Sequence, residues 1–489
     1  MKIPRIMIAG THSGVGKTTI TTAVMAAFAR DGSRVQPYKV GPDYIDPSYH
    51  TIATGNPSRN LDSWMLSDET VYRLFVQSAK EADVAVIEGV MGLFDGSQAL
   101  GDKGSSAQIA KLLDCPVILI VDVKSMARSA AAMVSGFVNF DPDLKIAGVI
   151  LNRIGSERHL RLVKEAIEAY CNVPVVGYIR KNAKLELPSR HLGLVPTVEG
   201  GTLPAKINSL ADEIGEGIDF AGIMQIALAA DDMKSAGNMK SVSAGIARNG
   251  GAAPSNKRVR IGLAWDEAFS FYYQDGLDEL VRQGADLVRF SPLHDNELPA
   301  DLDGIYIGGG FPEIFIQELA ANKGMLSRLR TTGERGMPIF AECGGLMYLT
   351  RVIVNFDNKE YGMVGLVPGR CIMEKSLVGM GYIKAEALNN NVISTPGQKL
   401  RGHEFHYSRL DPDGLDFSYA FRLTRNRSGE TFMDGYARNN ILASYAHLHF
   451  ASDPNLAARF IASCRAYRDG VESENTHHWY QCSSAADLF

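Results

Sequence analysis

One segment near the start of the chain restricts the fold more than any other. Residues 3–19 read IPRIMIAGTHSGVGKTT, an apolar run, a Gly-rich loop, and then Lys and Thr opening a helical stretch. In this order, backbone N–H groups of the loop turn toward phosphate oxygens and the helix N-terminus adds positive potential. The chain is therefore expected to begin with a nucleotide-binding α/β domain.

Each position of this phosphate loop has an expected role. Gly14 and Gly16 let the backbone approach the phosphates, and Lys17 reaches the terminal phosphates. Thr18 offers a hydroxyl to Mg²⁺, and Thr19 completes the nucleotide-binding set. ATP and Mg²⁺ are therefore the expected small-molecule partners of this end of the chain.

The loop departs from the usual spacing in two ways. Thr11 stands where the first Gly of G-x-x-x-x-G-K-[ST] belongs, one residue after Gly10. His12 stands where partition-type ATPases carry a signature Lys, which argues against the alternative of a cargo-positioning ATPase. The loop looks more like that of dethiobiotin synthetase, which phosphorylates a substrate carbamate.

Acidic residues follow the next predicted strands. Glu88 ends the buried run 84–88, and Asp95 lies a short loop later. Carboxylates at the carboxyl edge of a parallel sheet face the nucleotide crevice, so Glu88 is a candidate Mg²⁺ ligand.

A second cluster, YKVGPDYIDPSY, begins at residue 38. Lys39 ends a strand, while Asp43 and Asp46 are expected in a Gly/Pro-rich turn. One carboxylate would bind the metal through water, and the other would orient or polarise a substrate carboxyl group. Asn152, after the apolar run 147–151, is a candidate for hydrogen bonding to adenine.

The order of apolar runs indicates two α/β domains. A chain of 489 residues exceeds a single core of roughly 250–300 residues. Strands alternating with helical stretches predict a mostly parallel, doubly wound sheet over residues 1–229. Residues 230–257, rich in Gly, Ala and Ser, are expected to be a linker, and the pattern restarts over 258–469. The polar tail, 470–489, is expected to be irregular and poorly ordered.

The second domain contains a candidate nucleophile. Residues 338–349 read PIFAECGGLMYL, an apolar strand that ends at Cys343 and a helix that begins after two glycines. A tight strand-to-helix turn exposes the sulfur, and a helix N-terminus favours the thiolate. The Gly344 N–H is a candidate oxyanion donor, and the loop containing Gly309 and Gly310 is expected to complete the oxyanion hole.

A cysteine nucleophile needs a base. SYAHLHF supplies His447 and His449, which point to one face of a predicted strand. His447 is the predicted base, and His449 is either a third, orienting residue or a core histidine. The remaining cysteines form no CxxC pairs, so neither zinc nor a disulfide framework is indicated.

Composition excludes other classes of protein. With 45% hydrophobic and 21% charged residues, the chain is ordinary for a globular protein, and its net charge of −5 argues against a nucleic-acid partner. The apolar runs fall far short of the ~20 residues that cross a bilayer. The start of the chain does not read as a signal peptide, so the expected location is the cytoplasm.

Several motifs taken together resemble one family. AGTHSGVGKTT, KVGPDYIDPSYH, NLDSWM, VIEGVMGLFDG, SRHLGLVPTVE, GGGFPE, FAECGGLMYL, GHEFHYS and SYAHLHF match, in order, the cobyrinate a,c-diamide synthases. The resemblance implies a dethiobiotin-synthetase-like P-loop domain followed by a class I (triad) glutamine amidotransferase-like α/β domain. It also implicates the acids at Asp43, Asp46, Glu88 and Asp95, with Cys343 attacking glutamine.

The resemblance implies ATP- and glutamine-dependent amidation of an acidic tetrapyrrole through acyl phosphates. A related branch amidates Ni-sirohydrochlorin on the route to coenzyme F430, and the sequence leaves both substrates open. Cobyric acid synthase shares both domains but amidates other carboxylates. The expected partners are small molecules, namely the tetrapyrrole, ATP and L-glutamine, without nucleic acid or membrane, and a homodimer is a possible assembly.

Overall fold

The computed structural model describes residues 1–181, 203–233 and 257–483, with side chains described as far as residue 471. The chain divides into two compact units, Met1–Arg248 and Asn249–Phe489. Most of the expected linker and the whole SRHLGLVPTVE motif lie outside the described residues.

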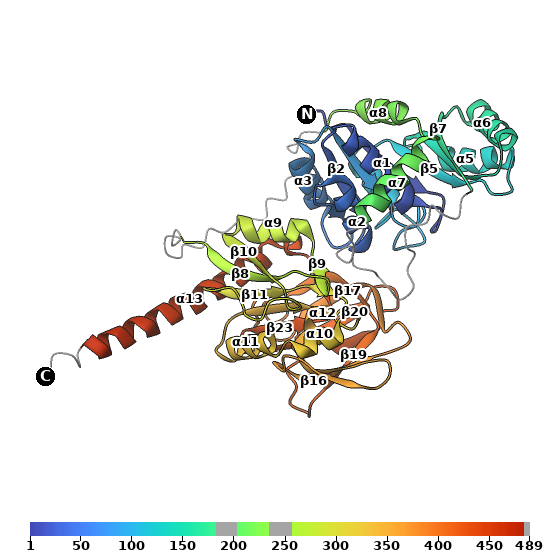
Figure 1. Ribbon diagram of the computed structural model, residues 1–489. Helices are drawn as coiled ribbons and strands as arrows, with labels where there is room; N and C mark the ends of the chain where they lie inside the picture. The colour runs from blue at the N-terminus through green and yellow to red at the C-terminus, as the bar shows by residue number, and fades with distance from the viewer. Residues whose placement is uncertain (182–202, 234–256, 484–489) are drawn as a thin grey trace. The chain divides into compact units, whose positions relative to one another are not determined.

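The first unit is built on a seven-stranded parallel sheet in the order β3-β2-β4-β1-β5-β6-β7. Its strands are β1 (Arg5–Gly10), β2 (Val35–Val40), β3 (Arg59–Leu61), β4 (Val84–Glu88), β5 (Val117–Asp122), β6 (Ile146–Ile154) and β7 (Val175–Arg180). Its helices are α1 (Lys17–Arg30), α2 (Ile45–Thr54), α3 (Asp68–Ala79), α4 (Ser106–Leu112), α5 (Ser129–Phe140), α6 (Glu157–Cys171), α7 (Leu203–Gly215) and α8 (Phe220–Leu228) (Figure 1).

The central strands of this sheet explain where a site can form. Every residue of β1 and β4 is buried, as expected for parallel strands covered on both faces. The strands β2, β4 and β1 are neighbours in the sheet although they lie far apart in sequence. Their carboxyl ends therefore bring the phosphate loop, Lys39 and Glu88 to one edge.

The second unit is built on a six-stranded sheet in the order β10-β8-β11-β13-β23-β22, parallel except for β22. Its strands are β8 (Val259–Ala264), β10 (Ala285–Phe290), β11 (Gly304–Ile307), β13 (Ile339–Glu342), β22 (Tyr436–Arg438) and β23 (Ile441–Ser444). The helices of this unit that come before residue 350 are α9 (Gln274–Arg282), α10 (Ile316–Ala321), α11 (Lys323–Glu334) and α12 (Gly344–Leu349).

Three smaller sheets complete this unit, in the orders β12-β9, β15-β14-β16-β19 and β21-β20-β17-β18-β24. Their strands are β9 (Phe269–Phe271), β12 (Gly309–Gly310), β14 (Thr350–Val354), β15 (Glu360–Gly362), β16 (Val367–Met373), β17 (Gly379–Ala387), β18 (Lys399–His406), β19 (Ser408–Pro412), β20 (Phe421–Arg425), β21 (Thr431–Asp434) and β24 (His447–Leu448).

The end of the chain differs from the prediction of an irregular tail. After the short 3₁₀ helix η3 (Phe450–Ser452), the helix α13 runs from Pro454 to Ser483. The polar composition after residue 470 suggested irregular backbone, but polar residues other than Gly and Pro are compatible with a helix. The prediction of an irregular tail is therefore wrong for residues 470–483.

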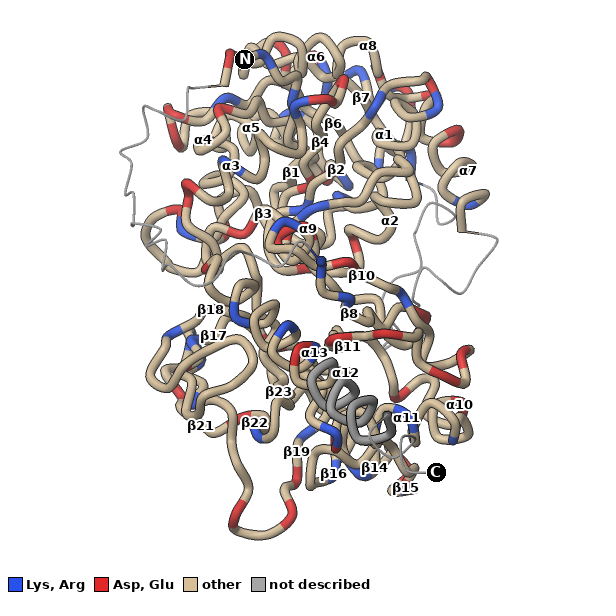
Figure 2. The backbone as a smooth tube through the Cα atoms, turned by 90° about the vertical axis from the view of Figure 1, so that its left-hand side faces the viewer, with Lys and Arg blue, Asp and Glu red and all other residues tan. Residues whose placement is uncertain are grey.

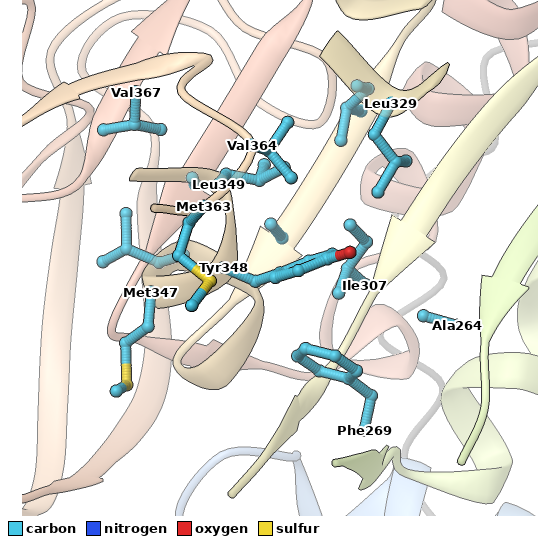
Figure 3. Close-up of a cluster of buried hydrophobic side chains, with 14 of the residues drawn as sticks. Ala264, Phe269, Ile307, Leu329, Met347, Tyr348, Leu349, Met363, Val364 and Val367 are labelled. Carbon is cyan, nitrogen blue, oxygen red and sulfur yellow. The ribbon is translucent and has the colours of Figure 1, made fainter. Parts of the chain in front are cut away.

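A buried cluster surrounds the helix that follows Cys343. Tyr348 of α12 is fully buried, and its ring centroid lies 5.2 Å from that of Phe269. Figure 3 shows the Tyr348 ring within this cluster, beside Phe269, Ile307 and Met363. This packing fixes α12, and with it the turn that carries the cysteine.

Charged residues of both signs are interspersed over each unit (Figure 2). Among the described residues, no helix combines the length and apolar character needed to span a membrane.

Candidate functional site

The phosphate loop has the backbone that its glycines predict. Gly14 and Gly16 have φ angles of 79° and 98°, in the region that favours glycine. A Cβ on Gly16 would lie 2.7 Å from Nδ2 of Asn152, which donates a hydrogen bond to the Val15 carbonyl at 2.8 Å. The structure thus places Asn152 against the loop itself, and its contact with adenine stays a prediction.

Lys17 and Thr18 open α1 beside this loop. The Lys17 side chain is buried, and its Nζ donates to the His12 carbonyl at 3.2 Å. Burial, with a smaller effect of the Lys39 charge, lowers the pKa of Lys17 to about 8. A phosphate anion nearby would offset both effects. Thr18 Oγ1 donates to Glu88 Oε1 at 2.7 Å, and Thr19 lies half-buried on the same helix.

Glu88 is the centre of a buried charged cluster. Lys39 Nζ lies 2.8 Å from Glu88 Oε1 and 2.7 Å from Asp46 Oδ2. His50 Nε2 lies 2.7 Å from Glu88 Oε2. The predicted residues Lys39, Asp46 and Glu88 therefore meet next to Thr18.

The charges in this cluster are strongly coupled. Burial would raise the pKa of Glu88, but the Lys39 charge and the contact with His50 outweigh it, so the pKa of Glu88 lies far below its usual range. Burial raises the pKa of Asp46 to about 6 despite Lys39. Burial would lower the pKa of Lys39, but the two carboxylates hold it above its usual value. Glu88 is thus held ionised in a site where an unpaired charge would be unstable.

The segment containing Asp43 and Asp46 differs from the predicted turn. Asp46 lies in the first turn of α2, and Asp43 Oδ1 accepts hydrogen bonds from the backbone N–H groups of Ile45 and Asp46 at 2.8 and 3.4 Å. Because Asp43 satisfies free N–H groups at the helix start and Pro47 is tolerated in a first turn, a helix forms here. Asp95 lies on an exposed loop, where its Oδ2 accepts from the Gly92 N–H at 2.9 Å.

His50 was not singled out from the sequence. It is fully buried, and it contacts Glu88 from α2. Asp46 and His50 are four residues apart, which places them on one face of a helix. Had the segment been interpreted as a helix, this spacing would have pointed to His50.

Cys343 lies in the predicted turn between β13 and α12. Its φ and ψ are 48° and −102°, and its backbone N–H donates to the Ser444 carbonyl at 2.7 Å. The residue is 6% exposed, and its Sγ lies 3.8 Å from the Phe405 carbonyl. Burial, followed by the charge of Glu313, raises the pKa of the thiol, and the Gly344 N–H offsets this only in part. The resting residue is therefore a thiol, not the thiolate that the helix N-terminus suggested.

The glycines proposed for the oxyanion hole lie together. A Cβ on Gly344 would be 3.0 Å from the Gly310 backbone nitrogen. A Cβ on Gly309 would be 2.5 Å from Cε1 of His447. The segment Gly309–Gly310 is not a flexible loop but the short strand β12, paired with β9. This strand therefore approaches both His447 and the residue after Cys343.

His447 belongs to a row of buried aromatic side chains. Its ring stacks on that of His403 with centroids 4.8 Å apart, and Tyr273 Oη lies 3.0 Å from His403 Nδ1. Burial, with smaller effects of His403 and His406, lowers the pKa of His447 well below its usual value. The imidazole is therefore neutral at pH 7, the form that accepts a proton.

Glu342, directly before Cys343, holds this region together. Its Oε2 accepts from Tyr306 Oη at 2.7 Å, and its Oε1 accepts from the Leu448 N–H at 2.7 Å. Burial raises the pKa of Glu342 to about 8. Its contact with Leu448 fixes the backbone beside His447, a positioning role that the sequence did not reveal.

His449 has a different environment. Its Nδ1 accepts from the Ala451 N–H at 3.1 Å, and its ring stacks on Tyr273 with centroids 4.8 Å apart. Within the described residues its Nε2 has no hydrogen-bond partner, and burial lowers its pKa to about 3. These contacts resemble those of a core histidine, and a third catalytic role stays a prediction.

Replacing Gly309 with Ala is expected to lower glutamine hydrolysis about 100-fold, because the new methyl group would displace the His447 ring. Gly362→Ala is the matched control, since no atom lies within 4 Å of its added Cβ. Steady-state hydrolysis of both variants would be measured, with thermal unfolding as a check. Equal activities would show that the position of His447 does not matter.

Comparisons with known proteins agree with this arrangement. Residues 6–195 match the CobQ/CobB/MinD/ParA nucleotide binding domain, and residues 260–455 match the CobB/CobQ-like glutamine amidotransferase domain. A cobyrinate a,c-diamide synthase of Dehalococcoides mccartyi (strain CBDB1) is 48% identical, covering 94% of this chain and 98% of its own length. Those of Methanothermobacter thermautotrophicus and Priestia megaterium are 46% and 43% identical, covering 93% and 94% of this chain and 98% and 97% of their own lengths.

The two family matches define the class of protein, in which a nucleotide-binding domain is joined to a glutamine amidotransferase domain. They confirm the fold class predicted from the sequence. At this identity over nearly the full length, the chain belongs to the cobyrinate a,c-diamide synthase family.

Proposed function

We propose that the chain converts the a and c carboxylates of a cobyrinate-type tetrapyrrole into carboxamides, using ATP and glutamine. The observation that carries this proposal is the cluster in which Thr18 of the phosphate loop and Lys39 both contact Glu88, while Lys39 also forms an ion pair with Asp46. Such a cluster would offer a cation and two carboxylates to a terminal phosphate and a substrate carboxyl group.

In the first unit, a substrate carboxylate oxygen attacks the γ-phosphorus of ATP and ADP leaves, which gives an acyl phosphate. Ammonia then attacks the carbonyl carbon, phosphate leaves, and the nitrogen loses a proton. Lys17 and Lys39 stabilise the charge on the phosphoryl and carboxyl oxygens. This route is needed because a free carboxylate has no adequate leaving group for ammonia to displace.

Mg²⁺ fits the residues near the phosphate loop. The ion prefers oxygen donors and needs only one or two carboxylates besides phosphate oxygens. Glu88 is held ionised next to the Thr18 hydroxyl, so the two residues supply oxygen donors and a negative charge. Thr18 and Glu88 would hold the ion, and the sequence predicts that Asp43 assists them. The ion would neutralise charge on the phosphate groups.

In the second unit, Cys343 transfers its proton to His447 and attacks the side-chain amide of glutamine. N–H groups near Gly310 and Gly344 hold the oxyanion, and the protonated His447 gives its proton to the departing ammonia. Water then attacks the thioester, His447 takes the proton, and glutamate leaves with the thiol restored.

The test is a product assay with glutamine and ATP in which cobyrinate and Ni-sirohydrochlorin are supplied separately. Each amidation replaces a carboxylate with a neutral amide and removes one negative charge, so the diamide has two fewer negative charges than the substrate and elutes earlier in anion exchange. Diamidation of cobyrinate supports the proposal, and diamidation of Ni-sirohydrochlorin alone would favour the alternative substrate. ATP hydrolysis without any glutaminase activity would favour a cargo-positioning ATPase.

A further inference from the structure

His447 belongs to β24, a strand of two residues at the edge of its sheet. The neighbouring strand β18 pairs with it in an antiparallel register that places His403 directly opposite His447. A Cβ on Gly402 would lie 2.3 Å from the His447 carbonyl oxygen, so glycine allows the two strands to approach closely here. Directly opposite residues of paired strands project from the same face of a sheet, which brings the His403 side chain to the predicted base.

The two side chains of this cross-strand pair stack on each other. The ring centroids of His403 and His447 are 4.8 Å apart, and the ring planes differ by 19°. Both residues are buried, with 6% and 2% of their surface exposed. Close packing around a buried, stacked ring restricts its plane, and the direction in which the His447 nitrogens point depends on that plane.

His403 is itself held by a residue from a third element. Tyr273, at the N-terminus of α9, has its Oη 3.0 Å from His403 Nδ1. The Tyr273 ring stacks in turn on that of His449, with centroids 4.8 Å apart and planes 16° from parallel. Four buried rings therefore form a row from His449 through Tyr273 and His403 to His447, and His403 is the member stacked on the predicted base.

We propose that His403 is a positioning residue for the glutaminase reaction, which holds the His447 ring where the imidazole receives the proton of Cys343, and that Tyr273 holds His403 in turn. This inference rests on the glutaminase half of the proposed function and adds to it the residue that orients the base. The orienting role thus falls to the neighbouring strand and not to His449. His403 neither gains nor loses a proton in the reaction.

The test measures glutamine hydrolysis and ammonium-driven amidation by variants of the full chain. His403→Ala is expected to lower kcat for glutamine hydrolysis about 100-fold and to change KM by less than about threefold, because a displaced base impairs proton transfer more than binding. His403→Phe keeps a ring that can stack, so it should recover about tenfold of this loss. Ammonium-driven amidation should stay unchanged in both variants.

Tyr273→Phe tests whether Tyr273 acts through His403. Alone, it should lower kcat about three- to tenfold, since it removes the hydroxyl at His403 Nδ1 and keeps the ring. In the His403→Ala background it should cause no further loss, because the partner through which it acts is already missing. His294→Ala, which removes an exposed histidine of the same unit, is the matched control and should behave like the original chain.

Three results would overturn the inference. One is an unchanged kcat in His403→Ala or, should that variant fail to fold, in Tyr273→Phe. Another is a loss that appears in KM and not in kcat, which would indicate a general disturbance of the site. The third is a larger loss of kcat in folded His449→Phe than in His403→Phe, which would give the orienting role to His449. Failure of the original chain to hydrolyse glutamine would instead contradict the glutaminase assignment itself.

Discussion

Replacement of Cys343 with Ser is expected to lower glutamine-dependent amidation by at least about 10³-fold, because a hydroxyl is a much weaker nucleophile than a thiol. Amidation driven by free ammonium should continue, since the phosphate loop and the Glu88 cluster lie in the other unit. The measurement is the rate of carboxamide formation with each nitrogen source, at saturating ATP.

The matched control is Cys171→Ser, which changes a half-buried free thiol in α6. It should leave both rates unchanged. Loss of the ammonium-driven rate in Cys343→Ser would contradict the division of labour between the units. Full glutamine-dependent activity in the same variant would remove Cys343 from the mechanism.

Replacement of Glu88 with Gln is expected to abolish amidation from both nitrogen sources, by about 10³-fold or more, while glutamine hydrolysis continues. The amide cannot offer Lys39 and Thr18 the charge that the carboxylate provides. Because the change removes one partner of a buried ion pair, it should also destabilise the first unit by about 3–5 kcal/mol. Amidation rates and denaturant unfolding would measure the two effects.

Thr18→Ala separates chemistry from folding, because it removes the hydroxyl that donates to Glu88 and one methyl group but leaves the buried ion pair intact. It should impair amidation with little change in unfolding. Glu81→Gln, an exposed acid before β4, is the control and should change neither property. Normal amidation by Glu88→Gln would mean that the cluster is purely structural.

The sequence predicted the elements whose signals are local. The apolar run of β4, the helix start at Lys17 and the turn at Cys343 are each contained in about ten consecutive residues. The residues of the phosphate loop were found because the loop, its lysine and its threonine are adjacent in the chain. Glu88 could be predicted because a charge directly after a buried strand needs a partner.

The residues that escaped prediction depend on distant contacts. His403 stacks on His447, and its hydrogen-bond partner Tyr273 lies 130 positions away in sequence. Glu342 is adjacent to Cys343 in sequence, but its contact with Leu448 joins residues 106 positions apart. That contact depends on the tertiary fold, which brings β24 next to the end of β13. The thiol of Cys343 was expected to ionise readily, but burial, which depends on the complete core, has the larger effect.

The backbone at residue 343 has a consequence for how the chain can evolve. A side chain held at φ 48° and ψ −102° is strained by about 1–3 kcal/mol, and glycine would relieve that strain. Selection for thermal robustness alone would therefore favour glycine at this position. A lineage that no longer needed glutamine would be expected to lose its thiol early, keeping the ATP-dependent half intact.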